Sequence, residues 1–150
     1  MPTVTVPVPT LRPFRASDAT ALVNRDGEQC TVAHLLMQAR SGPSFTAEVE
    51  GRILCAAGMV MPWPGMGQVW MLIGETLDPY GFWISKTVRR VVDDLSRQHR
   101  LHRLEAVALV ESPRNQQWLE WLGFTSEQQG VAQAYLTDRR SIIRYERIED

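Results

Sequence analysis

The stretch from Arg103 to Phe124 decides the fold, and it reads RLEAVALV, then ESPRN, then QQWLEWLGF. The apolar run Ala106–Val110 predicts a strand that is covered on both faces. Ser112 is placed to cap the helix that follows, with Pro113 at the first helical position. Gly123 predicts the left-handed residue that ends this helix, after which the chain enters another strand. The stretch is therefore one strand–helix unit with a Gly-Phe stop.

Composition indicates one globular domain spanning residues 1–150. The chain is 44% hydrophobic and 22% charged, which is ordinary for a globular protein. Prolines at positions 2, 7 and 9 predict that residues 1–10 form an extended arm or edge strand. The net charge of -1 provides no basic field that would attract nucleic acid or an anionic membrane.

Nothing in the sequence predicts a membrane segment or a signal peptide. No apolar stretch approaches the roughly 18 residues that a membrane helix needs, and the N-terminal residues lack a basic region followed by an apolar one. Cys55 lies in an apolar run, which favours a small buried thiol over a disulfide with Cys30. We therefore expect a cytoplasmic protein that contacts neither nucleic acid nor membrane.

Hydrophobic periodicity predicts the remaining elements. Before the deciding stretch, the pattern predicts a strand at 11–14, helices at 17–25 and from 31, strands at 45–50, 52–61 and 68–75, and a long helix through 83–95. After it, strands at 131–137 and 141–148 form a closing hairpin. This order predicts an α/β (α+β) fold with a mixed central sheet and helices on both faces.

Two phrases, together with this order, resemble the GNAT acetyltransferase superfamily. LRPFRASD at Leu11–Asp18 is similar to the way many members enter their first helix, and WLEWLGF at Trp118–Phe124 is similar to their last core helix. The strand at Gln68–Gly74 is also similar to one in small GNAT-like proteins of tailed phages, including an internal virion protein. The resemblance covers residue 10 to the C-terminus and implies a GNAT-like acyl-CoA N-acyltransferase fold.

The resemblance also implies a coenzyme site for acetyl-CoA, without a metal. In GNAT enzymes the third meander strand and the strand after the long helix splay apart, and the pantetheine arm lies between them. By this resemblance the arm would contact Met71, Leu72 and Ile73. The pyrophosphate would lie at Gly81 and Phe82, where the N–H groups and dipole of the long helix favour an anion.

The phosphate loop departs from the family pattern. In GNAT enzymes this loop usually begins with Arg or Gln, has Gly at its fourth position and ends with Gly or Ala at its sixth. In the equivalent stretch of this chain, DPYGFW, Asp78 occupies the first position and Trp83 the sixth. A carboxylate about 5 Å from a phosphate charge costs roughly 1 kcal/mol in water, and Pro79 lacks an N–H donor. We expect Trp83 to obstruct close approach of a phosphate. The cations Lys86, Arg89 and Arg90 either compensate in part or form a solvated helix face.

The catalytic pattern is incomplete as well. Leu119 stands where many GNAT enzymes place a Tyr general acid, and Ser112 stands where an Asn often begins the same helix. A general base would deprotonate the acceptor amine, and Glu75 and Glu111 are the candidates at their strand ends. Each of these glutamates is equally consistent with a solvated strand end.

The loop Pro62–Gly67 is the candidate interface. Its sequence PWPGMG predicts that Trp63 and Met66 are exposed, either at a long hairpin tip or at a contact with another protein. His99 and His102 lie in a basic segment that predicts a helix C-terminus. No acidic or Cys residue accompanies these histidines at a metal-binding spacing.

Two functions remain open from the sequence. The first is an N-acyltransferase that uses acetyl-CoA to modify a small-molecule or protein amine. The second is a GNAT-fold protein without catalysis, a phage structural or interaction protein with a homo-oligomeric or virion partner, which would be located in the virion. The altered loop and the missing Tyr favour the second function, and the architecture favours the first.

Overall fold

The computed structural model describes residues 7–26, 31–74, 79–136 and 139–149. The predicted element order is confirmed. The elements are β1 (Thr10–Pro13), α1 (Ala16–Asp26), α2 (Val32–Arg40), β2 (Ser44–Val49), β3 (Arg52–Val60), β4 (Met66–Ile73), α3 (Gly81–Gln98), β5 (Arg103–Leu109), α4 (Pro113–Trp121), β6 (Thr125–Ala132) and β7 (Ile142–Ile148).

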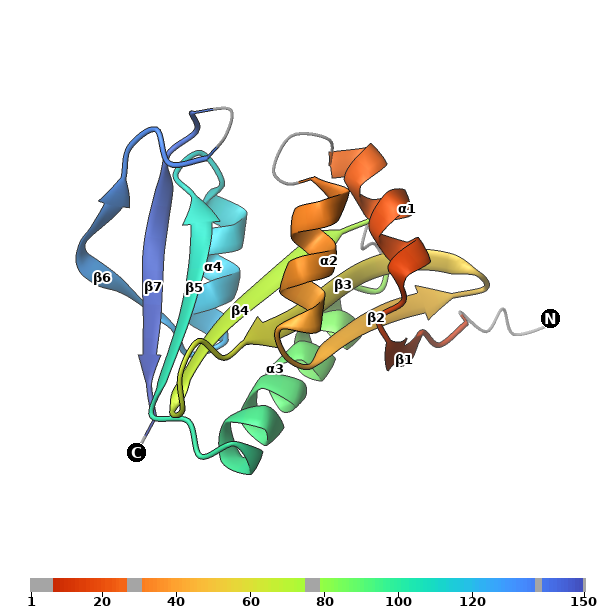
Figure 1. The fold of residues 1–150 in the computed structure, drawn as a ribbon, viewed down its shortest axis with the longest axis horizontal. Coiled ribbons are helices and arrows are strands. Elements are labelled where there is room, and N and C mark those ends of the chain that lie inside the picture. The colour runs from red at the N-terminus through yellow and green to blue at the C-terminus, as the bar shows by residue number, and fades with distance from the viewer. Residues whose placement is uncertain (1–6, 27–30, 75–78, 137–138, 150) are drawn as a thin grey trace, which may run out of the picture.

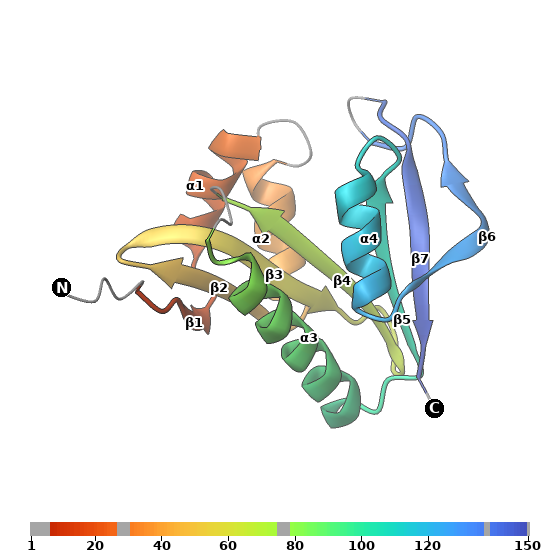
Figure 2. The same cartoon turned by 180° about the vertical axis from the view of Figure 1, so that it is seen from behind.

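One seven-stranded sheet runs through the molecule in the order β1-β2-β3-β4-β5-β7-β6. All neighbouring strands are antiparallel except β4 and β5, which are parallel. Helices α1 and α2 cover one face of β2–β4 (Figure 1), and α3 covers the other. Helix α4 lies against β5 on the same side as α3 (Figure 2). The predicted mixed sheet with helices on both faces is therefore confirmed.

Apolar side chains fill three clusters between these layers. The largest lies under α3 and α4, where Val92, Leu119 and Leu104 are buried together with Tyr145 of β7. A second joins the first turns of α3 to β2 and β3, and a third lies under α1 and α2. Burial of this apolar surface is the main stabilising contribution to the fold.

A buried carboxylate fixes the first helix to the sheet. Asp18, in the first turn of α1, is 2% exposed and accepts two hydrogen bonds of 2.8 Å from the Arg12 guanidinium. It also accepts from the Arg15 backbone N–H at 2.9 Å and from the Thr46 hydroxyl at 2.8 Å. Since Arg12 lies in β1 and Thr46 in β2, one side chain ties three elements together.

The strand in the deciding stretch is covered on one face only, contrary to the prediction. Ala106 and Ala108 are buried under α3 and α4, whereas Val107 between them is 52% exposed. The reason is that α1 and α2 lie over β2–β4 and leave the opposite face of β5 uncovered (Figure 1). An alternating strand of small apolar residues has the same sequence signature as a fully buried one.

The closing hairpin also begins earlier than predicted. Strand β6 starts at Thr125, directly after Phe124, and ends at Ala132. Its register with β7 shifts between Ser126 and Val131, and Gln129 in this bulge has φ 57°. The Gly-Phe stop correctly predicts a strand directly after α4. The bulge carries polar residues that interrupt period-two alternation, so periodicity placed the hairpin strand only at 131–137. Asp138, in the predicted turn, lies outside the described residues.

Met66 is buried, which overturns its predicted exposure in an interface loop. It is 2% exposed and starts β4, where it pairs with Arg103. The carbonyl of Gly65 accepts from the backbone N–H groups of His102 and Arg103, so the loop is held against the start of β5. Trp63 remains outside this contact and is 59% exposed.

Candidate active site

The strands β4 and β5 form a wedge. They pair only at Met66–Gln68 with Arg103–Glu105, and beyond these residues they diverge (Figure 2). The splayed strands that the resemblance implied are thus present. We call the region where Val69–Ile73 of β4 diverges from Ala106–Leu109 of β5 the wedge. On its β5 side, the backbone of Val69–Ile73 has no strand partner among the described residues.

The three predicted coenzyme contacts on β4 lie on different faces. Met71 packs toward α3, against the cluster that contains Tyr80 and Ile84. Leu72 is buried on the opposite face, under α1 and α2. Ile73 ends the strand and is 41% exposed. Side-chain contact with a ligand on the α3 face is therefore open to Met71 and Ile73, since alternate residues share a face.

The N-terminus of α3 is open to solvent at Gly81. A Cβ atom built on Gly81 would meet no neighbouring atom within 4 Å. The preceding residue, Tyr80, is buried and makes no side-chain cap hydrogen bond. Phe82 is 76% exposed. Trp83 packs toward the sheet, beside Ile84.

Two residues of the predicted site, Glu75 and Asp78, lie outside the described residues. Glu111 is placed beyond the end of β5, and its carboxylate lies 3.6 Å from the Arg140 guanidinium. Its side chain is 66% exposed. Leu119 is buried in the α4 cluster and brings no hydroxyl to the site. The assignment of Glu111 as a general base stays a prediction.

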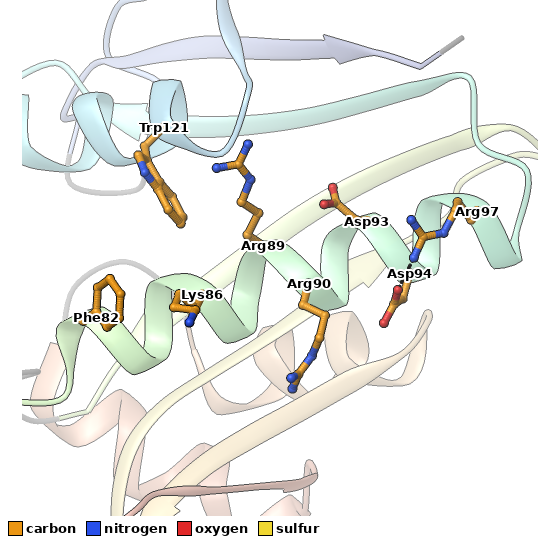
Figure 3. A pocket seen from close by; sticks show the side chains of 8 residues that line it. All are labelled: Phe82, Lys86, Arg89, Arg90, Asp93, Asp94, Arg97 and Trp121. Carbon is orange, nitrogen blue, oxygen red and sulfur yellow. Dashed lines mark hydrogen bonds and ion pairs between the residues drawn. The ribbon is translucent and has the colours of Figure 1, made fainter.

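A groove runs along the outer face of α3 and up to α4. It has a volume of about 500 Å³ and is lined by Phe82, Lys86, Arg89, Arg90, Asp93, Asp94, Arg97 and Trp121 (Figure 3). We call it the basic groove. The two acids are already paired, since Asp94 accepts from Arg97 and Asp93 accepts from Arg147 at 2.7 Å.

Three cations of the basic groove have no carboxylate partner within the described part of the chain: Lys86, Arg89 and Arg90. Two of them lie over aromatic rings instead. The Lys86 ammonium is 5.2 Å from the centre of the Phe82 ring, and the Arg89 guanidinium is 4.8 Å from that of Trp121. Unpaired cations beside exposed rings favour a ligand that carries both negative charge and a flat apolar group.

Side chains of α4 bridge to α3 above the wedge. The indole N–H of Trp118 donates to the Ser85 hydroxyl at 2.9 Å, and Trp121 stacks under Arg89 one turn further on. Gln116 donates two hydrogen bonds of 2.9 Å to the carbonyls of Leu109 and Val110. It thereby joins α4 to the end of β5. Ser112, the predicted cap, makes no side-chain cap hydrogen bond.

Sequence reasoning missed these bridges. The only signal for them was two tryptophans on α4 at a spacing of three, and that spacing is equally typical of core packing.

Neither a metal ion nor a reactive thiol is supported by the side chains. Within the described ranges, no group of three His, Cys, Asp or Glu side chains could hold an ion. Burial raises the pKa of the Cys55 thiol to about 12, so this thiol is not a nucleophile at neutral pH.

Comparisons with known proteins show which fold this chain shares. No protein-family model matches the sequence, and no curated protein matches it. Solved structures do. An IAA acetyltransferase from Bacillus cereus superposes with a TM-score of 0.75 at 13% identity, over 95% of this chain and 100% of that one. The ribosomal-protein-S18-alanine N-acetyltransferase from Escherichia coli superposes with a TM-score of 0.73 at 14% identity, over 94% of each chain.

This chain has the GNAT acetyltransferase fold. A spermidine N-acetyltransferase chimera from Vibrio cholerae and hSSAT also superposes, with a TM-score of 0.70 at 16% identity, over 93% of this chain and 95% of that one. The GNAT fold thus spans nearly the whole length of the chain. In the described part of this GNAT-fold protein, no helix is long and apolar enough to span a membrane.

Proposed function

We propose that this protein binds acyl-CoA and transfers its acyl group to an amine. The observation that carries the proposal is that three features lie on one side of the sheet. They are the wedge between β4 and β5, the open N-terminus of α3 at Gly81, and the basic groove along the outer face of α3. Each has the chemistry of one part of coenzyme A.

The thioester arm matches the wedge. It carries amide groups, and the β5-facing backbone of Val69–Ile73 offers N–H and C=O groups without a strand partner in the described chain. The pyrophosphate matches the helix N-terminus at Gly81, where unpaired N–H groups and the helix dipole favour an anion. The nucleotide matches the basic groove, with its unpaired cations and the exposed rings of Phe82 and Trp121.

The reaction this arrangement supports is direct transfer. The acceptor amine attacks the thioester carbonyl, a C–N bond forms, the C–S bond breaks, and the amine proton is lost as the thiolate leaves. Glu111 is our candidate for the group that accepts that proton, at the end of β5. Leu119 cannot protonate the thiolate, so we expect that proton to come from solvent.

Calorimetric titration with acetyl-CoA tests the proposal. We expect binding in the micromolar range. The double variant Lys86→Ala with Arg90→Ala should weaken it about tenfold, since each substitution removes a cation that would contact a phosphate of the bound coenzyme. Arg40→Ala is the matched control, because Arg40 lies at the end of α2 on the other face. Absence of binding by the native chain at millimolar acetyl-CoA would end the acyl-CoA hypothesis.

The second function, a GNAT-fold protein without catalysis, has its own supporting observations. Leu119 supplies no acid, and Trp63 presents an exposed indole between two prolines. A partner, whether a second copy or a virion protein, would bind through this loop. The likeness to phage proteins stays a prediction that rests on Gln68–Gly74 alone.

A further inference from the structure

We propose that Trp118 controls access to the wedge, and that its bond to Ser85 must break before an acyl arm can enter. This inference rests on the proposed function, since it concerns how the same site opens. We call the pair of residues the Trp118–Ser85 latch. It makes Ser85 and Trp118 positioning residues rather than catalytic ones.

The latch joins α3 to α4 on the sheet face that carries two features already described, the wedge and the N-terminus of α3 at Gly81. The wedge opens on the sheet face that carries α3 and α4, and Gly81 begins α3 on that face (Figure 2). A ligand that reaches from Gly81 into the wedge passes between the first turns of α3 and helix α4. Ser85 is on the second turn of α3, and Trp118 reaches it from α4 with a hydrogen bond of 2.9 Å.

Trp118 also belongs to the core on this side of the sheet. It packs, half-buried, against the cluster that contains Ala106 and Ala108 of β5. Val69 of β4 and Val88 of α3 pack against the same cluster. The indole thus joins a cluster to which both edges of the wedge contribute, on the face where the proposed arm would lie.

The contacts that close the passage are ones that can break without unfolding. Helices α3 and α4 are joined here by side chains, through Trp118 with Ser85 and Trp121 with Arg89. In the described chain, no backbone hydrogen bond connects the two helices. A neutral hydrogen bond contributes little net stability because its partners can bond to water instead. Rotation of the indole is therefore an accessible motion.

The latch has a consequence for affinity. In the free protein the bond stabilises the closed form, and binding must overcome that stabilisation. Removing the bond therefore tightens binding, as expected for any change that raises the population of the competent state. We expect Ser85→Ala to tighten acetyl-CoA binding about fivefold, which corresponds to about 1 kcal/mol.

The experiment uses Ser85→Ala, Trp118→Phe and the double variant, titrated with acetyl-CoA by calorimetry. Both substitutions remove the same hydrogen bond, so we expect the double variant to bind no tighter than either single one. Ser126→Ala, an exposed serine on β6, is the control. In parallel, the indole N–H resonance of Trp118, assigned from its loss in Trp118→Phe, should shift on addition of acetyl-CoA as the bond to Ser85 breaks.

Three results would overturn the latch. If the native chain binds while Ser85→Ala binds equally or more weakly, Ser85 is not a barrier. If binding leaves the Trp118 indole resonance unchanged, the ring does not move. In both cases the acyl-CoA proposal stands. If neither the native chain nor the double variant binds acetyl-CoA, both the latch and the proposed function are wrong.

Discussion

At the scale of single residues, Asp18 is the clearest case of a charge that the fold needs. Burial alone would raise its pKa, but the hydrogen bonds from Arg12, Arg15 and Thr46 outweigh burial and lower the pKa below the usual 3.8. The carboxylate is thus ionised at neutral pH. Arg12 also pairs with Glu48 at 3.0 Å, so the guanidinium keeps a partner when Asp18 is lost.

We expect Asp18→Asn to lower the free energy of unfolding by about 3 kcal/mol at pH 7, because it leaves buried donors without their charged acceptor. The folded-state pKa is depressed, so this contribution is fully present above the unfolded pKa of about 4 and is lost as pH falls through the folded value. Urea unfolding at pH 7 measures the loss of stability, and repeating it at pH 3 measures how much of that loss depends on pH. Asp94→Asn, at an exposed pair, should change little; an equal loss there would contradict the prediction.

At the scale of elements, α4 shows how a helix is bounded by its sequence. Pro113 occupies the first turn, and Gly123 follows the helix with φ 98°, a conformation that L side chains rarely adopt. The backbone N–H of Phe124 returns to the Leu119 carbonyl at 3.0 Å, which closes the C-terminal turn. Gly81 differs, because its φ is not positive and nothing crowds it.

The two glycines are expected to respond in opposite ways to alanine. Gly123→Ala should lower stability by about 2 kcal/mol through backbone strain, and the added Cβ would lie 3.3 Å from Arg147. Gly81→Ala should leave stability unchanged or slightly higher yet weaken acetyl-CoA binding at the phosphate position. Thermal unfolding and calorimetry measure the two effects. If Gly81→Ala binds as tightly as the native chain, the pyrophosphate does not lie there.

The elements themselves were largely predictable, whereas the contacts between them were not. The second helix starts within one residue of the predicted position 31, and Thr31 caps it by accepting from the His34 N–H at 3.1 Å. Such local signals lie within a few residues. The Trp118–Ser85 bond joins residues 33 positions apart, and its geometry depends on how two helices cross. Met66 was misread because loop composition says nothing about where the next strand starts.

At the scale of the whole molecule, Trp63 is a large apolar side chain on the surface, in the loop between β3 and β4. Its loop is hydrogen-bonded to the start of β5 through the Gly65 carbonyl, so the indole is presented on a backbone that is fixed to the sheet. A fixed, exposed Trp is typical of a contact residue, because little conformational entropy is lost on binding.

If this surface joins two copies of the chain, Trp63→Ala should shift a dimer toward monomer. Light scattering across a tenfold concentration range measures the mass, and Met37→Ala, an exposed apolar residue on α2, is the control. A native chain that is monomeric throughout would show that the loop does not mediate self-association.

The short parallel junction between β4 and β5 also bears on how the protein unfolds locally. Among the described residues, three pairs connect the antiparallel meander to the C-terminal strands within the sheet. Because the core under α3 and α4 spans this seam, we expect local opening to begin where the two strands diverge rather than to split the domain. A ligand bound across the seam would stabilise both sides at once, by an amount that grows with its concentration. The separation of β4 from β5 would then link global stability to the coenzyme that we propose binds there.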